Sequence, residues 1–167
     1  MKHKVLKKQN NSNSCIVCGL ENDFGIKASF YEIDNGELVA VCICENHHQS
    51  YPGRLHGGVS AALLDETIGR AINITNPDLW GVTIELNTKY RKPVPLGEEL
   101  KVVGRITKET HRGFEGTGEI ILKNGDIAVT AHGKYIKLTL DKITESDFIS
   151  DEWVTVENED DPKEIIL

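Results

Sequence analysis

Long apolar runs and an excess of basic side chains are both missing from this sequence of 167 residues. No stretch approaches the roughly 18 consecutive apolar residues that a membrane-spanning helix requires. Residues 1–8 are basic but lack the apolar core of a signal peptide, so we expect a cytoplasmic protein with no membrane partner. The net charge of −7 also disfavours nucleic-acid binding, which requires Lys and Arg to displace counterions.

Cysteine is scarce, and its four copies form two pairs, Cys15-x-x-Cys18 and Cys42-x-Cys44. Four thiolates would suit a tetrahedral zinc site. However, Cys42 and Cys44 lie in an apolar, β-branched stretch, where alternate residues point to the same face of a strand. Small buried side chains are the simpler interpretation, so we expect no metal. A zinc-stapled interaction module stays as a third possibility for the whole protein.

Hydrophobic periodicity predicts one long helix among several strands. The helix covers residues 57–74, and Asn76-Pro77 ends it. Asp34-Asn35-Gly36 and Asn124-Gly125 predict hairpin turns. The predicted strands are residues 26–33, 37–44, 81–91, 99–110, 113–123 and 127–140. Strict alternation along residues 81–91 would place Thr83 and Leu86 on opposite faces of their strand.

One helix and five to six antiparallel strands predict an α+β fold in which a curved sheet wraps the helix. The predicted domain spans residues 15–140, after an N-terminal segment, residues 1–14, that we expect to be disordered. Residues 141–167 form an acidic tail, which we expect to be solvated, with a short helix near residues 145–153. A sheet covered on one side only leaves exposed edges, so we expect the protein to dimerise.

The most informative motif is the start of the predicted helix, where His56-Gly57-Gly58 precede an apolar run that contains Asp65 and Glu66. Each glycine weakens a helix by roughly 1 kcal/mol relative to alanine. A carboxylate on a packed face also loses hydration. Both costs are explained if the helix N-terminus binds an oxyanion and Asp65 takes part in catalysis. This combination predicts acyl transfer or hydrolysis. The alternative is that the glycines only permit close packing and Asp65 is structural.

Further motifs follow this one along the chain. They are Leu64-Asp65-Glu66 with Gly69, Gly81-Val82-Thr83-Ile84-Glu85-Leu86-Asn87, and Tyr90-Arg91-Lys92-Pro93-Val94-Pro95-Leu96-Gly97. With His56-Gly57-Gly58, they resemble the hotdog-fold acyl-CoA thioesterases of the phenylacetate-degradation type. Cys15-Ile16-Val17-Cys18-Gly19 and Gln49-Ser50-Tyr51-Pro52-Gly53-Arg54-Leu55 resemble a subgroup of that family. The resemblance covers roughly residues 15 to 138, and it implies a homodimer or homotetramer with active sites at the subunit interface.

The resemblance also implies catalytic roles. The Gly57 N–H would stabilise the oxyanion, while Gly58 assists or only permits close approach. Asp65 would be the general base or the nucleophile, and Thr83 would orient the attacking water. His56 would cap the helix, orient the Gly57 peptide or contact the thioester. Glu66 points elsewhere because adjacent helical positions lie about 100° apart, and we expect it to be solvated. Arg70, five residues past Asp65, lies on a different helix face, and we expect it to be structural or at the dimer contact.

Substrate-binding candidates lie in three loops. Gln49 and Ser50 occupy the loop where some relatives place an Asn, and Gln49 has the better reach. Basic groups near the proline turn would pair with coenzyme A phosphates, although each also fits a solvated charge. The remaining candidates are Tyr90, Arg91, Lys92 and Arg112.

The sequence therefore predicts an acyl-CoA thioesterase that acts on a small, aromatic or medium-chain acyl group. No cofactor is expected beyond the coenzyme A of the substrate. The rival interpretation is a non-catalytic hotdog protein that binds acyl-CoA. A dehydratase on the same fold is disfavoured, because its Asp-x-x-x-x-His pattern is missing.

Overall fold

The computed structural model describes residues 1–167. Its elements in chain order are β1 (Lys2–Lys8), β2 (Asn11–Ser12), β3 (Ser29–Ile33), β4 (Leu38–Ile43), η1 (Asn46–His48), α1 (Gly57–Arg70), η2 (Ala71–Ile74), β5 (Trp80–Tyr90), β6 (Glu99–Glu109), β7 (Gly113–Ile121), β8 (Ile127–Leu138), α2 (Leu140–Ile143), α3 (Phe148–Asp151), β9 (Trp153–Val154) and β10 (Glu164–Ile166).

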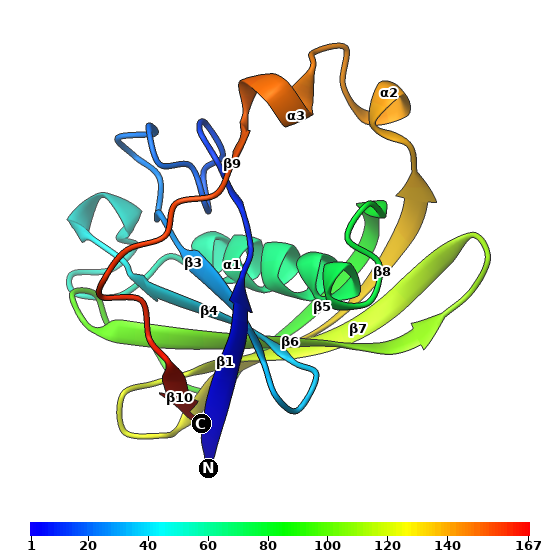
Figure 1. The fold of residues 1–167 in the computed structure, drawn as a ribbon. Coiled ribbons are helices and arrows are strands. Elements are labelled where there is room, and N and C mark those ends of the chain that lie inside the picture. Colours follow the sequence, from blue (N-terminus) through cyan, green and yellow to red (C-terminus); the bar gives the residue numbers. More distant parts are fainter.

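Eight strands form one antiparallel sheet in the order β10-β1-β3-β4-β6-β7-β8-β5, and β2 pairs with β9 apart from it. The sheet curves around α1, which lies along its concave face (Figure 1). The predicted α+β architecture is therefore confirmed. The sheet is larger than predicted because strands from both ends of the chain extend it beyond β3.

The two termini differ most from expectation. Residues 1–14, expected to be disordered, contain β1 and β2, and β1 pairs with both β3 and β10. The acidic segment returns along β1, so the two ends of the chain lie side by side (Figure 1). Opposite charges and one apolar contact accompany this pairing: Lys2 contacts Glu164, Lys8 Nζ lies 2.7 Å from Asp161 Oδ1, and Ile165 is buried in an apolar cluster. The complementary charges are about 160 positions apart, so local pattern alone does not reveal them.

The core lies between α1 and the sheet. Leu63, Leu64 and Ile68 of α1 are fully buried there. A Cβ atom on Gly116 or Gly118 of β7 would lie 2.6 or 2.9 Å from the Ile68 side chain, so these glycines set how closely the helix approaches. None of the helices has the length and apolar character needed to cross a membrane.

Candidate active site

The N-terminus of α1 holds its backbone donors in a fixed arrangement. The His56 ring accepts a 2.9 Å hydrogen bond at Nδ1 from the Gly58 N–H. The N–H groups of Val59 and Ser60 donate to the His56 carbonyl oxygen at 3.0 and 3.1 Å. The Gly57 N–H has no acceptor within the chain. Of the two glycines, Gly57 therefore has its donor free for a ligand, at the positive end of the helix dipole.

A cleft of about 360 Å³ lies beside this helix start, and Gly57, Ser50 and Arg91 are among its lining residues. Tyr90, at the end of β5, also lines it, and its hydroxyl donates to the Gly57 carbonyl oxygen at 2.6 Å. The end of β5 is thereby fastened to the first turn of α1. The residue that carries the free donor thus lines an open cleft.

Asp65 lies two turns further along α1, where β5 and β8 supply two hydroxyl groups. The Thr83 hydroxyl donates to the carboxylate, at 2.8 Å from Oδ1 and 3.1 Å from Oδ2. The Tyr135 hydroxyl lies 3.2 Å from Oδ1 and 3.0 Å from the Asp65 carbonyl oxygen. Burial, followed by the negative charge of Asp65, raises the pKa of Tyr135, so its phenol stays a proton donor. The carboxylate is therefore held as an oriented acceptor.

Tyr135 is the functional residue that the sequence did not reveal. It is the direct cross-strand partner of Thr83, so both side chains point from the sheet toward α1. Its ring stacks on Phe114, with centroids 4.9 Å apart. No local motif marks this tyrosine. The available signal is Gly133, two positions earlier, where a Cβ atom would lie 2.6 Å from the Tyr135 hydroxyl.

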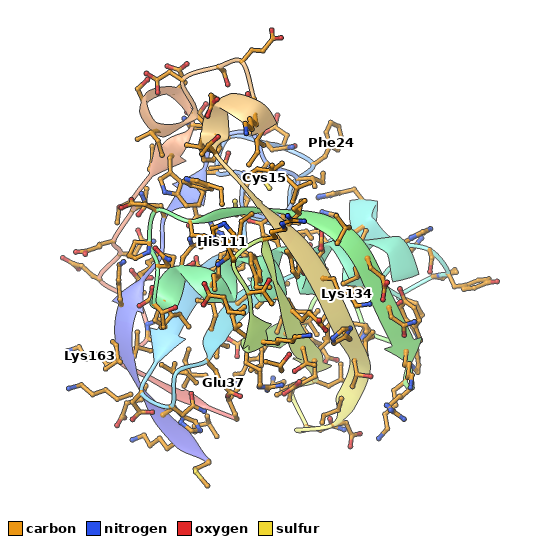
Figure 2. The ribbon with its side chains drawn as sticks, turned by 90° about the vertical axis from the view of Figure 1, so that its right-hand side faces the viewer. Cys15, Phe24, Glu37, His111, Lys134 and Lys163 are labelled. Atoms are coloured by element: carbon orange, nitrogen blue, oxygen red, sulfur yellow. The ribbon has the colours of Figure 1, made fainter.

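The predicted alternation along β5 is wrong at its centre. The pairing of β5 with β8 shifts register between Thr83 and Glu85, which leaves Ile84 as a bulge. Thr83 consequently faces Asp65, and Leu86 packs against the same core. Ile84 is 64% exposed on the outward side of the sheet. Figure 2 presents this side, with Lys134 of β8 pointing away from the core.

Glu66 faces a different part of the molecule. Its carboxylate accepts a hydrogen bond from the Cys15 thiol at 3.1 Å and lies 3.6 Å from Arg70 Nε. The Glu66 side chain is 19% exposed, so the prediction of a solvated Glu66 is wrong. Arg70 is buried, with its guanidinium over the rings of Phe30 and Trp153 at 4.2 and 4.6 Å. This position fits the expected structural role of Arg70.

The other predicted binding residues are divided between two places. Lys92 lies at the same cleft as Gly57, but its ammonium group forms a 2.7 Å ion pair with Asp126. The Gln49 side chain accepts the Gly53 N–H at 3.0 Å and so stabilises its own turn. Arg112 lines a separate cleft of about 240 Å³ on the outward side of the sheet. Ser50 and Arg91 are therefore the best-placed groups for contact with a ligand at Gly57.

Gly57 and Asp65 are not brought together within one chain. Eight residues separate them on α1, which corresponds to about 12 Å along the helix axis. A reacting carbonyl must lie about 3 Å from both an oxyanion donor and the attacking group. Within one copy of the chain, the donor and the carboxylate therefore lie too far apart to act on the same carbonyl.

Comparison with known proteins supports the thioesterase superfamily. The family model described as "Thioesterase superfamily" matches residues 52–129. Human acyl-coenzyme A thioesterase 13 is 30% identical over 74 residues, which is 44% of this chain and 53% of that protein. The chain therefore spans about half the length of this curated relative.

Solved structures confirm the hotdog thioesterase fold. A crystal structure of a thioesterase superfamily protein has a TM-score of 0.67 and 30% identity, covering 73% of this chain and 59% of its own. The Escherichia coli PaaI protein from the phenylacetic acid degradation operon has a TM-score of 0.61 and covers 68% of this chain and 80% of its own. Its identity is 17%, so this likeness concerns the fold alone. The subgroup with an N-terminal Cys-x-x-Cys-Gly stays a prediction.

Proposed function

We propose that the protein is an acyl-CoA thioesterase whose active sites are completed by a second copy of the chain. The observation that carries this proposal is the Asp65 carboxylate, which two hydroxyls orient beside the edge strand β5. The free Gly57 N–H lies too far away on the same helix to serve the same carbonyl. Pairing of two copies would bring the Gly57 of one copy to the Asp65 of the other.

The β5 edge is the surface proposed for this pairing. β5 ends the sheet, so one side of its backbone has no strand partner. Val82 and Ile84 add exposed apolar area beside that edge. An unpaired edge with apolar side chains favours association with a second strand. Antiparallel pairing of β5 with the same strand of a second copy would form a twofold symmetric dimer, and a tetramer of two such dimers is compatible with it.

The proposed chemistry divides hydrolysis between the two copies. The Gly57 N–H would polarise the thioester carbonyl and stabilise the oxyanion. The partner subunit's Asp65 would either remove a proton from an attacking water or attack the carbonyl itself to give a mixed anhydride. In the first route the water oxygen bonds to the carbonyl carbon, the C–S bond breaks, and the proton held by Asp65 passes to the departing coenzyme A thiolate. In the second route the C–S bond breaks as the anhydride forms, coenzyme A leaves and takes a proton from solvent, and water then hydrolyses the anhydride to free the acid and Asp65. Thr83 would hold the carboxylate in position throughout, and no cofactor is used beyond the coenzyme A of the substrate.

Substrate recognition is proposed at the cleft beside Gly57. Ser50, Tyr90 and Arg91 line it, and Arg91 would pair with a phosphate of coenzyme A. The acyl group is proposed to be small, aromatic or medium-chain. A cytoplasmic location likewise stays a prediction of the sequence. The alternative function is acyl-CoA binding without turnover. It would use the same cleft, but it would give the Asp65 carboxylate no catalytic role.

Thiol release from a panel of short, aromatic and long acyl-CoAs tests the proposal. We expect wild type to turn over at least one substrate and Asp65→Ala to lose about 10²–10⁴-fold in kcat/KM. Asp78→Ala is the matched control, because Asp78 is exposed and contacts neither Asp65 nor Gly57. Coenzyme A binding with no turnover of any substrate would support the binding protein instead.

A further inference from the structure

Two thiols and a carboxylate converge on the face of α1 that the proposed catalysis does not use. The Sγ atoms of Cys15 and Cys18 and a Glu66 carboxylate oxygen all lie within 4.8 Å of one another. Cys18 is buried and Cys15 is half-buried, so the cluster is screened from solvent but reachable from the Cys15 side. Figure 2 shows Cys15 in the upper part of the molecule, where the C-terminal helices also lie.

The loop around the two cysteines is built to present their sulfur atoms. The Val17 N–H donates to Cys15 Sγ and the Ser12 N–H donates to Cys18 Sγ, both at 3.3 Å. At Cys15 such a donor favours the thiolate, which is the form that binds metals. The neighbouring Cys15 and burial raise the pKa of Cys18, so the metal must displace the proton of that thiol. Gly19 closes the turn with a 2.8 Å hydrogen bond to the Cys15 carbonyl oxygen. A Cβ atom on Gly19 would lie 2.2 Å from that oxygen, so the turn requires glycine.

Neighbouring side chains hold the loop and balance its charge. The Glu152 carboxylate accepts hydrogen bonds from the backbone N–H groups of Asn13 and Ser14, at 3.1 and 2.9 Å. Two thiolates and Glu66 would together carry three negative charges. A divalent cation and the adjacent guanidinium of Arg70, 3.6 Å from Glu66, would neutralise them. The surroundings thus suit a metal ion better than three bare anions.

We propose that Cys15, Cys18 and Glu66 bind a Zn²⁺ ion. Thiolate with carboxylate is a donor set that zinc accepts, at about 2.3 Å from sulfur and about 2.1 Å from oxygen. Tetrahedral geometry then places the ligand atoms about 3.6–3.8 Å apart, within the spread of this cluster. Three protein ligands leave the fourth position to water. Cys42 and Cys44 are buried in the core and do not belong to the cluster, so this is not the four-thiolate site considered from the sequence.

Binding would exchange protons for the metal. Each thiol loses its proton to solvent, and the hydrogen bond from Cys15 to Glu66 is replaced by two bonds to zinc. The ion would join the N-terminal loop to α1 at the residue next to Asp65. This inference stands independently of the proposed thioesterase activity, because it concerns the bridge between the loop and the helix.

Metal content of the full chain without an affinity tag tests the proposal. After equilibration with Zn²⁺ and dialysis, we expect about one zinc per wild-type chain by elemental analysis. Cys15→Ala and Cys18→Ala are expected to lose that zinc, and Glu66→Gln to bind it at least about tenfold more weakly in competition with a chromophoric chelator. Cys42→Ala is the matched control and is expected to keep one equivalent, because it removes a buried thiol outside the cluster.

Cobalt provides a readout that a change in folding would not imitate. Co²⁺ bound by thiolates gives a charge-transfer absorption in the near ultraviolet, which Cys15→Ala should remove while Cys42→Ala retains it. Circular dichroism verifies that each variant is folded. If a cysteine variant does not fold, Glu66→Gln still tests the zinc site, because it keeps the shape of the side chain. Absence of stoichiometric zinc in wild type would overturn the proposal. Free thiols are also titrated in protein that is denatured without a reductant. Two reactive thiols instead of four would indicate a disulfide and overturn the proposal.

Discussion

Asp65 and Glu66 are neighbours on α1, yet they face two different regions of the molecule. Asp65 is oriented by the hydroxyls of Thr83 and Tyr135 beside the open β5 edge. Glu66 lies under the N-terminal loop, against Cys15 and Arg70. The first region lies beside a sheet edge, whereas the second lies between the N-terminal loop and Arg70, whose guanidinium packs on Trp153 of the C-terminal segment. The rotation of about 100° between adjacent helical residues is thus enough to place one carboxylate beside an open sheet edge and the next in a half-buried cluster.

The largest effect is expected where Asp65 is oriented. Thr83→Val and Tyr135→Phe each remove one hydroxyl donor, and a hydrogen bond to a charged group contributes about 1.5–3 kcal/mol. We expect each single variant to lower kcat/KM about 10–100-fold and the double variant about 10³-fold, measured by thiol release. Thr83→Ser restores the hydroxyl and should remain within about threefold of wild type. Full activity in Thr83→Val would show that Asp65 does not depend on this donor.

A somewhat smaller effect is expected on the Glu66 side, and in stability rather than in rate. Arg70→Met leaves Glu66 without its cation and removes the guanidinium from Phe30 and Trp153. We expect the free energy of unfolding in urea to fall by about 2–4 kcal/mol. Arg112→Met, at an exposed turn, should change it by less than about 0.5 kcal/mol. Equal stability of the two variants would contradict the structural role of Arg70.

The smallest effect concerns the end of the C-terminal segment. Burial alone would raise the pKa of Asp161, but the Asn158 N–H, Lys8 and Tyr31 donate to it and hold its pKa below the usual value. The pKa of Tyr31 is correspondingly raised to about 12, by burial and by its hydrogen bond to Asp161. Because the folded-state pKa of Asp161 is depressed, its contribution to stability is present above the unfolded-state pKa of about 3.9 and declines as the pH falls.

Asp161→Asn tests this linkage. At pH 7 we expect the free energy of unfolding to fall by about 1 kcal/mol. The difference from wild type should stay constant down to about pH 4 and then close as the pH falls through the lower, folded-state pKa. Urea denaturation between pH 7 and pH 2.5 measures both curves. If the stability difference between wild type and Asp161→Asn grew as the pH fell, the result would contradict a depressed pKa of Asp161 in the folded state.

Local patterns predicted the central helix and the strands around it. Period and turn residues located the start of α1 at Gly57 and the ends of β5 to β8 to within two residues. The bulge at Ile84 was not predictable, because it arises from the pairing of β5 with β8 rather than from either strand alone. The pairing of β1 with β10 was missed for a similar reason, since β1 is mostly basic and β10 is only three residues long, so neither strand is marked by its own pattern.

The candidate site was predictable in part. Gly57 and Asp65 stand out because glycine and a carboxylate are each costly in an apolar helix. Tyr135 does not stand out, because an aromatic residue in a strand is ordinary until its cross-strand partner is known. The neighbours of Glu66 were hidden as well, since Cys15 approaches it only through the loop that follows β2.

Mixing two inactive variants tests most directly whether the site is shared between copies. Gly57→Pro deletes the proposed oxyanion donor at the first helical position, where proline is favoured. The extended backbone of His56, with φ −63° and ψ 135°, also suits a residue before proline. We expect Gly57→Pro to lower kcat/KM by about 10²–10³-fold. Asp65→Asn should be similarly inactive, because an amide cannot act as a base.

Refolded together in equal amounts, the two variants form mixed dimers in about half of the population, and each mixed dimer has one intact site. The account therefore predicts that activity returns to about a quarter of the wild-type value. If Gly57 and Asp65 act within one chain, no mixed dimer contains an intact site. Activity that stays at the level of the separate variants would then contradict the shared site.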